Sequence, residues 1–289
     1  MYKCKVYQGH PIAYREVGSG EQTILFLHGM GSSSLGWEDT IQALKEDYRC
    51  IAVDLPGFGM TPWIETQDLF GLYLNLISDL VTDLIGSSLI VAGHSMGGQL
   101  AMLSALDMPH QVSGVILSAP AGLEPYSVED RRLTEQFFSL SQVMQWDEEE
   151  VKGHFLRNFY EMPSWAEPLL QQRLEKLTGE RHEGFCKAVA AAVSGMLDYP
   201  LPNKTVDIPM TVIFGQQDQY IPNRVLHPEL TVDKVASSIK QLTNNYSIHL
   251  LEDCGHFPHV EQRTKCLSII RSIVEQYFQT TSMPVNIDG

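Results

Sequence analysis

Three polar side chains that could act together lie far apart in the chain, at Ser95, Asp218 and His256. A serine hydroxyl is a weak nucleophile at neutral pH. It becomes reactive when a histidine takes its proton and a carboxylate orients that histidine. The order serine, aspartate, histidine is one of the chain orders in which such triads occur. The sequence therefore predicts Ser95 as the nucleophile, His256 as acid and base, and Asp218 as the orienting group.

The residues around Ser95 match the pattern Gly-x-Ser-x-Gly, with glycines at 93 and 97. Leu89–Ala92 is a short apolar run of the kind that forms a buried strand, and a helical pattern begins at Met96. A sharp strand-to-helix turn would expose the Ser95 hydroxyl, and the flanking glycines would prevent clashes. A turn made only for structural reasons is the simpler alternative.

Two backbone N–H groups are predicted to stabilise a negatively charged oxygen. The Met96 N–H lies at the predicted helix N-terminus, and the second donor is the Met30 N–H, in the loop after the predicted strand Thr23–Leu27. Gly29 would let this loop approach a substrate closely. His28 and His94 flank the same region, and we expect both to bond to loops and not to act as the base.

Asp218 and His256 each follow a predicted strand, Met210–Phe214 and Ile248–Leu251 respectively. Ligands gather at the carboxyl ends of strands in parallel sheets, so these side chains are expected near Ser95. Taken alone, Asp218 could be a turn residue. The alternatives for the site are the neighbours Asp253 and His259 and the reserve acids Glu124 and Asp54, of which Asp54 is expected to hold its own loop together.

Strands that alternate with helices predict an α/β fold with a mostly parallel, doubly wound sheet. Residues 2–17 resemble an edge hairpin, and further strands are predicted at Cys50–Val53 and Val112–Leu117. Helices are predicted at Trp37–Leu44, at Leu69–Ile85, around Val232–Leu242 and from about Val260 to Phe278.

Residues 122–205 interrupt this alternation, because they carry helical periodicities without a convincing strand. We predict an inserted all-helical cap over the carboxyl edge of the sheet, with residues 1–121 and 206–289 forming the core. The cap is rich in large apolar side chains, and some of them should line an apolar pocket. The residues predicted to contact substrate there are Met144, Trp146 and Phe159.

The composition restricts the partners of the protein. A formal net charge of −15 disfavours nucleic acid and anionic membranes, and no apolar run is long enough to span a membrane. The five cysteines are scattered and no signal peptide is visible, so we expect a cytoplasmic protein with reduced thiols, as a monomer or homodimer. No motif implies a metal or an organic cofactor.

The segments His28–Gly31, Asp54–Gly59 and Gly93–Gly98, together with Asp218 and His256, resemble those of the α/β-hydrolase superfamily, in its branch with a serine nucleophile and a helical cap. The resemblance covers nearly the whole chain outside residues 122–205. It implies the α/β-hydrolase fold and the roles given above for the triad and for Met30 and Met96. The loop at 28–31 lacks the consecutive glycines of one esterase branch. Relatives that dehalogenate substrates or open epoxides use aspartate as the nucleophile, which Ser95 argues against.

The leading functional prediction is a carboxylesterase that cleaves small to medium apolar esters through an acyl-enzyme. A carbon–carbon bond hydrolase acting on ring-cleavage products, which are vinylogous 1,5-diketones, is the first alternative. A receptor that binds its ligand without turnover is the second. An aminopeptidase is the third, and it would need an acidic group for the substrate amine, for which Glu124, Glu161 and Glu167 are candidates.

Overall fold

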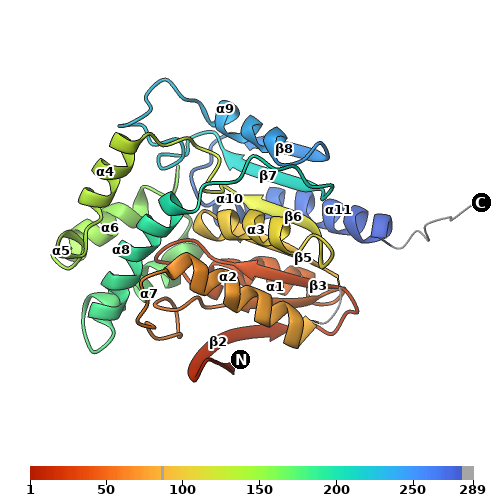
Figure 1. Cartoon of the computed structure of the whole chain (residues 1–289), viewed down its shortest axis with the longest axis horizontal. Helices are drawn as coiled ribbons and strands as arrows, with labels where there is room; N and C mark the ends of the chain where they lie inside the picture. The colour runs from red at the N-terminus through yellow and green to blue at the C-terminus, as the bar shows by residue number, and fades with distance from the viewer. Residues whose placement is uncertain (86–87, 282–289) are drawn as a thin grey trace, which may run out of the picture.

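The computed structural model describes residues 1–85 and 88–281. Its eight strands form one sheet in the order β1-β2-β4-β3-β5-β6-β7-β8. The pairings β1–β2 and β2–β4 are antiparallel and all others are parallel, which confirms the predicted fold class (Figure 1). The strands are β1 (Tyr2–Tyr7), β2 (His10–Val17), β3 (Thr23–Leu27), β4 (Arg49–Val53), β5 (Leu89–His94), β6 (Val112–Ser118), β7 (Met210–Gly215) and β8 (Tyr246–Leu251).

Both faces of the sheet are covered, as the continuous apolar runs of its central strands require. Alternate residues of β3 point to opposite sides: Leu25 and Leu27 join one core cluster, while Ile24 and Phe26 join the other. The first cluster packs under α2 (Leu69–Leu80), α3 (Met96–Asp107) and α9 (Val232–Ala236). The second packs under α1 (Glu38–Leu44) and α11 (Arg263–Thr281).

Several predicted helices are divided in the structure. The stretch 37–44 is a 3-10 turn, η1 (Ser34–Trp37), followed by α1, and 69–85 is α2 followed by a π-helical turn, η2 (Val81–Ile85). The stretch 232–242 is α9 followed by η5 (Ser237–Gln241). The last predicted helix is α10 (Pro258–Glu261) and α11, which are separated at Gln262. Short local turns of this kind are not visible in hydrophobic periodicity.

Between β6 and β7 every regular element is helical, and the structure describes this whole segment. We call it the helical insertion; it lies beyond one edge of the sheet, in the yellow-green to green part of Figure 1. Its elements are α4 (Val128–Phe137), α5 (Leu140–Val143), α6 (Glu148–Leu156), η3 (Ser164–Ala166), α7 (Glu167–Leu174), η4 (Glu175–Leu177) and α8 (His182–Asp198). A third apolar cluster, which includes Phe155, Phe159 and Phe257, joins the insertion to the segment after β8.

Among the helices of the described residues, none combines the length and apolar character needed to cross a membrane. The sequence beyond Thr281, which belongs to the predicted core domain, lies outside the described residues.

Candidate active site

The turn between β5 and α3 holds Ser95 in a strained conformation, with φ 50° and ψ −117°. Left-handed φ values are rare for residues other than glycine, and they concentrate at functional sites. The neighbouring glycines permit this turn. A Cβ at Gly93 would lie 2.1 Å from the Gly97 carbonyl oxygen, and one at Gly97 would lie 2.4 Å from the Leu27 carbonyl oxygen. The turn therefore has the geometry that the Gly-x-Ser-x-Gly pattern predicted.

Asp218 and His256 meet at the carboxyl edge of the sheet. The Nδ1 atom of His256 lies 2.7 Å from Oδ2 of Asp218, and both side chains are buried. The other carboxylate oxygen, Oδ1, accepts the backbone N–H groups of Tyr220 and Ile221 at 2.8 and 3.0 Å. Because a carboxylate only accepts, His256 Nδ1 carries the proton and Nε2 is left as a base.

The backbone around His256 is fixed from three directions. Its N–H donates to the Asn158 carbonyl of the helical insertion at 2.6 Å, and its carbonyl accepts the Nε2–H of His94 at 2.8 Å. The preceding Gly255 N–H donates to the Glu261 carboxylate at 2.7 Å. The imidazole is therefore held by the core and by the insertion together.

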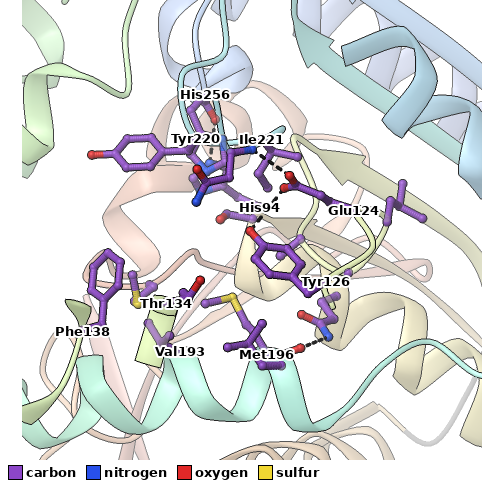
Figure 2. A pocket seen from close by; sticks show the side chains of 18 of the residues that line it. His94, Glu124, Tyr126, Thr134, Phe138, Val193, Met196, Tyr220, Ile221 and His256 are labelled. Carbon is purple, nitrogen blue, oxygen red and sulfur yellow. Dashed lines mark hydrogen bonds between the residues drawn. The ribbon is translucent and has the colours of Figure 1, made fainter. Parts of the chain in front are cut away.

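Ser95 and His256 line one cavity of about 540 Å³ between the sheet edge and the helical insertion. Within the described residues no hydrogen bond joins the Ser95 hydroxyl to His256; such contacts are often loose without substrate and tighten when it binds. The size suits a small organic molecule. Apolar side chains of the insertion form much of the wall: Phe138, Trp146, Phe185, Val193 and Met196. Figure 2 shows Phe138, Val193 and Met196 among them.

The loop after β3 is held by a half-buried arginine. Met30 lines the cavity, and the Arg173 guanidinium donates from Nε to the Gly31 carbonyl at 3.1 Å and from Nη2 to the Met30 carbonyl at 3.3 Å. Met96 begins α3, so its N–H cannot bond within the helix. In the described part of the chain neither the Met30 nor the Met96 N–H has an acceptor, as an oxyanion hole requires.

Three predicted substrate contacts do not line the cavity, whereas Trp146 does. The Met144 side chain is 44% exposed at the end of α5, and Phe159 is buried against Phe155 and Phe257. Gly29 packs behind Ser95, where a Cβ would lie 2.6 Å from His94 Nδ1 and 3.2 Å from the Ser95 Cβ. These three residues are therefore not part of the cavity wall. Local sequence does not show which residues of a loop or at the end of a short helix face inward.

Asp54 and His28, which were not expected to be catalytic, both have structural partners. Asp54 accepts the N–H groups of Ser34 and Met60 and so ties its loop together, as predicted. His28 accepts the Leu55 N–H and donates to the Gly29 carbonyl, and burial lowers its pKa.

The three remaining alternatives differ in where they lie, and Asp253 is exposed outside the cavity wall. His259 is buried, contacts the Ser118 hydroxyl at 2.8 Å and stacks on Trp37. Only Glu124, of the three acids considered for an amine, lines the cavity.

Sequence reasoning missed Arg173 and Asn158 altogether. Arg173 lies in a polar stretch of α7, where an arginine ordinarily faces solvent, and its pKa is lowered to about 10 by burial. Asn158 acts through its backbone carbonyl, which any residue would supply. No local signal distinguishes either of them.

The sheet order, the turn at Ser95 and the Asp218–His256 pair together define a hydrolase scaffold. The model of the Alpha/beta hydrolase family matches residues 24–267, and the chain belongs to that family. A serine nucleophile is typical of the family.

Named relatives point to hydrolysis. The chain is 27% identical, over 86% of each sequence, to a 2-hydroxy-6-oxononadienedioate/2-hydroxy-6-oxononatrienedioate hydrolase of Burkholderia vietnamiensis. Among solved structures it resembles a probable hydrolytic enzyme of Pseudomonas aeruginosa, with a TM-score of 0.77, 24% identity and coverage of 95% and 93% of the two chains. It also resembles a meta-cleavage product hydrolase of Pseudomonas fluorescens, with a TM-score of 0.74, 21% identity and coverage of 97% and 98%. The curated relatives support a hydrolase, and the structures show the shared fold.

Proposed function

We propose that the protein hydrolyses a carbon–carbon bond in a ring-cleavage product, a vinylogous 1,5-diketone that carries a carboxylate beside one carbonyl. Ser95, His256 and Asp218 would be its catalytic triad, and Met30 and Met96 its oxyanion donors. The named relatives support this reaction over the hydrolysis of simple carboxylic esters. The observation within this chain that carries the proposal is Arg173, a half-buried cation in the cavity wall.

Arg173 is a cation in the cavity wall without a carboxylate partner among the described residues. Its hydrogen bonds go to two backbone carbonyls, and its guanidinium lies 5.2 Å from the centre of the Phe155 ring. A guanidinium has five N–H donors, and those two carbonyls use only two of them. Burial lowers the pKa of this group, so its charge is partly shielded from water without a counter-charge, and a substrate carboxylate would supply one.

The proposed substrate carries this carboxylate next to the 2-oxo group, which accepts electrons during cleavage. In the keto form of the substrate, Ser95 Oγ adds to carbonyl C6 while His256 takes its proton, and the oxyanion faces the Met30 and Met96 N–H groups. The C5–C6 bond then breaks. Its electron pair delocalises into the conjugated 2-oxo group, and the proton returns from His256 to give 2-hydroxypenta-2,4-dienoate. Water then adds to the acyl group on Ser95, with His256 as base, and releases the carboxylic acid and free Ser95.

An esterase would use the same triad, but a neutral apolar ester gives Arg173 no counter-charge. The carboxylesterase predicted from the sequence is therefore the second choice. The two functions differ in what they require of the substrate: only the proposed one needs a carboxylate on the leaving part of the molecule.

The test compares a 6-alkyl-2-hydroxy-6-oxohexa-2,4-dienoate with its 1-methyl ester, following loss of the dienolate absorbance, and uses p-nitrophenyl butyrate as the simple ester. We expect cleavage of the acid, loss of all turnover in Ser95→Ala, and a preference for the acid over its methyl ester. Arg173→Gln should lower kcat/KM for the acid by about 10- to 100-fold, the scale of a hydrogen bond to a charged group, and lower that of the methyl ester much less.

Arg132→Gln is the matched control, because Arg132 is exposed and pairs only with Glu129. It should leave both substrates unaffected. Serine-dependent hydrolysis of p-nitrophenyl butyrate without cleavage of any dienoate would establish the esterase instead. Equal losses for the acid and its methyl ester in Arg173→Gln would show that Arg173 only supports the loop at Met30.

A further inference from the structure

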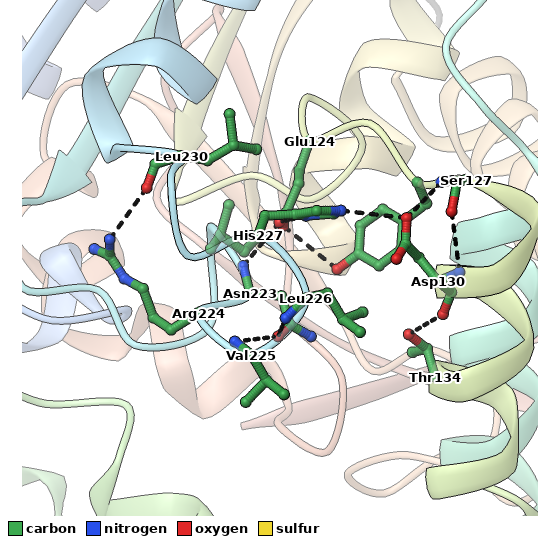
Figure 3. A network of polar contacts seen from close by, with 12 residues as sticks. Glu124, Ser127, Asp130, Thr134, Asn223, Arg224, Val225, Leu226, His227 and Leu230 are labelled. Carbon is green, nitrogen blue, oxygen red and sulfur yellow. Dashed lines mark hydrogen bonds and ion pairs between the residues drawn. The ribbon is translucent and has the colours of Figure 1, made fainter.

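The cavity wall contains a second ionisable group that the triad does not use. Glu124, in the segment between β6 and α4, lines the cavity with a side chain only 3% exposed. Its Oε1 accepts the Asn223 N–H at 2.8 Å and lies 2.5 Å from His227 Nδ1. Its Oε2 lies 3.4 Å from the Tyr126 hydroxyl, a long contact that leaves room for another donor (Figures 2 and 3).

The surroundings of Glu124 are acidic. His227 lies between two carboxylates, because its Nε2 is 3.4 Å from Asp130 Oδ2 of α4 (Figure 3). Burial alone would lower the pKa of His227, but the hydrogen bonds to Glu124 and Asp130 outweigh it and raise this pKa. Burial raises the pKa of Glu124, and the bonds from His227 and Asn223 oppose that change. Even with His227 protonated, Glu124 and Asp130 share one cation, and the nearby cation of the cavity wall, Arg131, is already paired with Asp198, so this group of charges is net negative.

Arg173 and Glu124 belong to different ends of the cavity. Arg173 bonds to the loop at Met30 and Gly31, and its charge acts on Tyr220. Glu124 bonds instead to Asn223 and His227. These residues follow Tyr220 in the loop after β7. In Figure 2 the Tyr220 ring extends to the left, while Glu124 and Tyr126 lie to the right. The cavity thus has a cationic end and an acidic end, with Ser95 and His256 in the same wall.

We propose that Glu124 selects the acyl part of the substrate, excluding a second carboxylate there and accepting a hydrogen-bond donor such as an amide or a hydroxyl. This assignment rests on the proposed function, which sets how the substrate lies in the cavity. A substrate carboxylate bound to Arg173 would direct the other end of the molecule toward Glu124. A molecule with carboxylates at both ends, like the dioates in the names of the relatives, would then place its second carboxylate against Glu124.

The test uses three dienoates that differ only in the 6-substituent: 2-carboxyethyl, the isosteric 2-carbamoylethyl, and n-propyl. At pH 8 we expect the wild-type protein to prefer the carbamoyl over the carboxy compound by about 10-fold or more in kcat/KM, as repulsion by a nearby like charge requires. Glu124→Gln should bring the two within about 3-fold of each other. Glutamine keeps the carbonyl oxygen that Asn223 and His227 use, so this variant preserves the network.

Glu129→Gln is the matched control, because Glu129 is exposed and pairs only with Arg132; it should retain the wild-type preference. A wild-type protein that prefers the carboxy compound, or treats both alike, overturns the assignment. So does a preference that Glu124→Gln leaves unchanged.

The n-propyl compound separates this inference from the proposed function. If it is cleaved, carbon–carbon hydrolysis holds and the other two compounds decide the role of Glu124. If no dienoate is cleaved, the proposed function fails. The p-nitrophenyl esters of 3-carboxypropanoic and 3-carbamoylpropanoic acid, which carry the same acyl groups, then decide the role of Glu124 by the same criteria.

Discussion

Replacing Asp218 with asparagine tests the central geometry of the site. In the native protein Oδ1 accepts two backbone N–H groups, from Tyr220 and Ile221, and Oδ2 faces His256 Nδ1 at 2.7 Å. Asparagine has nearly the same shape, but one of its two polar atoms is an NH2 group that only donates. The result therefore depends on which way the new amide is oriented.

The two backbone N–H groups decide that orientation. If the amide NH2 took the Oδ1 position, it would face two other donors, and two buried N–H groups would lose their acceptor at about 1–3 kcal/mol each. The amide oxygen therefore stays at Oδ1, and the NH2 group faces His256. It donates to Nδ1 and forces the imidazole proton onto Nε2, so His256 can no longer accept the Ser95 proton.

We expect Asp218→Asn to lower kcat/KM by about 10⁴-fold, the effect known for a wrong tautomer in such triads, which corresponds to about 5 kcal/mol of transition-state stabilisation. The assay is dienoate cleavage, supported by the rate at which a fluorophosphonate labels Ser95. Asp233→Asn, at an exposed position on α9, is the control and should retain full activity. A loss smaller than about 10-fold in a folded Asp218→Asn protein would refute the reasoning, since His256 would then not depend on Asp218.

Three further predictions concern the folded state. Trp37→Ala removes a ring stacked on His259 and the hydrogen bond to the Leu27 carbonyl, and should lower the free energy of unfolding in urea by about 3–5 kcal/mol. Burial lowers the pKa of His259 from 6.5 to about 3, so only the unfolded chain binds its proton between these values. The free energy of unfolding should therefore decrease as the pH is lowered below 6.5. His259→Gln should reduce this pH dependence by up to about 1.4 kcal/mol per pH unit, measured by urea titrations at several pH values. Finally, a thiol reagent should label Cys4 alone in the native protein, because the other four cysteines are buried, and all five in urea; rapid native labelling of more than one thiol would contradict the burial.

The arrangement of Ser95, Asp218 and His256 could be predicted because each side chain follows a buried strand. Continuous apolar runs mark such strands clearly, and the carboxyl ends of parallel strands share one edge of the sheet. The strained backbone of Ser95 was equally predictable, since glycines at 93 and 97 are what its turn requires. In these cases a local pattern specifies the local conformation, and the topology of the sheet brings the residues together.

The wall of the cavity could not be predicted in this way, because its helices are short. The element α5 has four residues and ends before Met144, so the period of 3.6 residues has too little length to define an inward side. Met144 proved exposed, whereas Trp146, two residues later, lines the cavity. Which of them points inward depends on the packing of α5 against α8, a contact between residues distant in the sequence.

The charged residues of the cavity wall could not be predicted from the sequence either. Arg173 and Glu124 look like ordinary surface residues in the sequence, since charged side chains are rarely buried without partners. Each is instead held by groups from a distant segment: Arg173 by the backbone carbonyls of Met30 and Gly31, and Glu124 by the backbone N–H of Asn223 as well as by the His227 side chain. Backbone partners leave no trace in residue identity. The charges through which we propose the cavity selects its substrate therefore become visible only when the helical insertion is packed against the sheet.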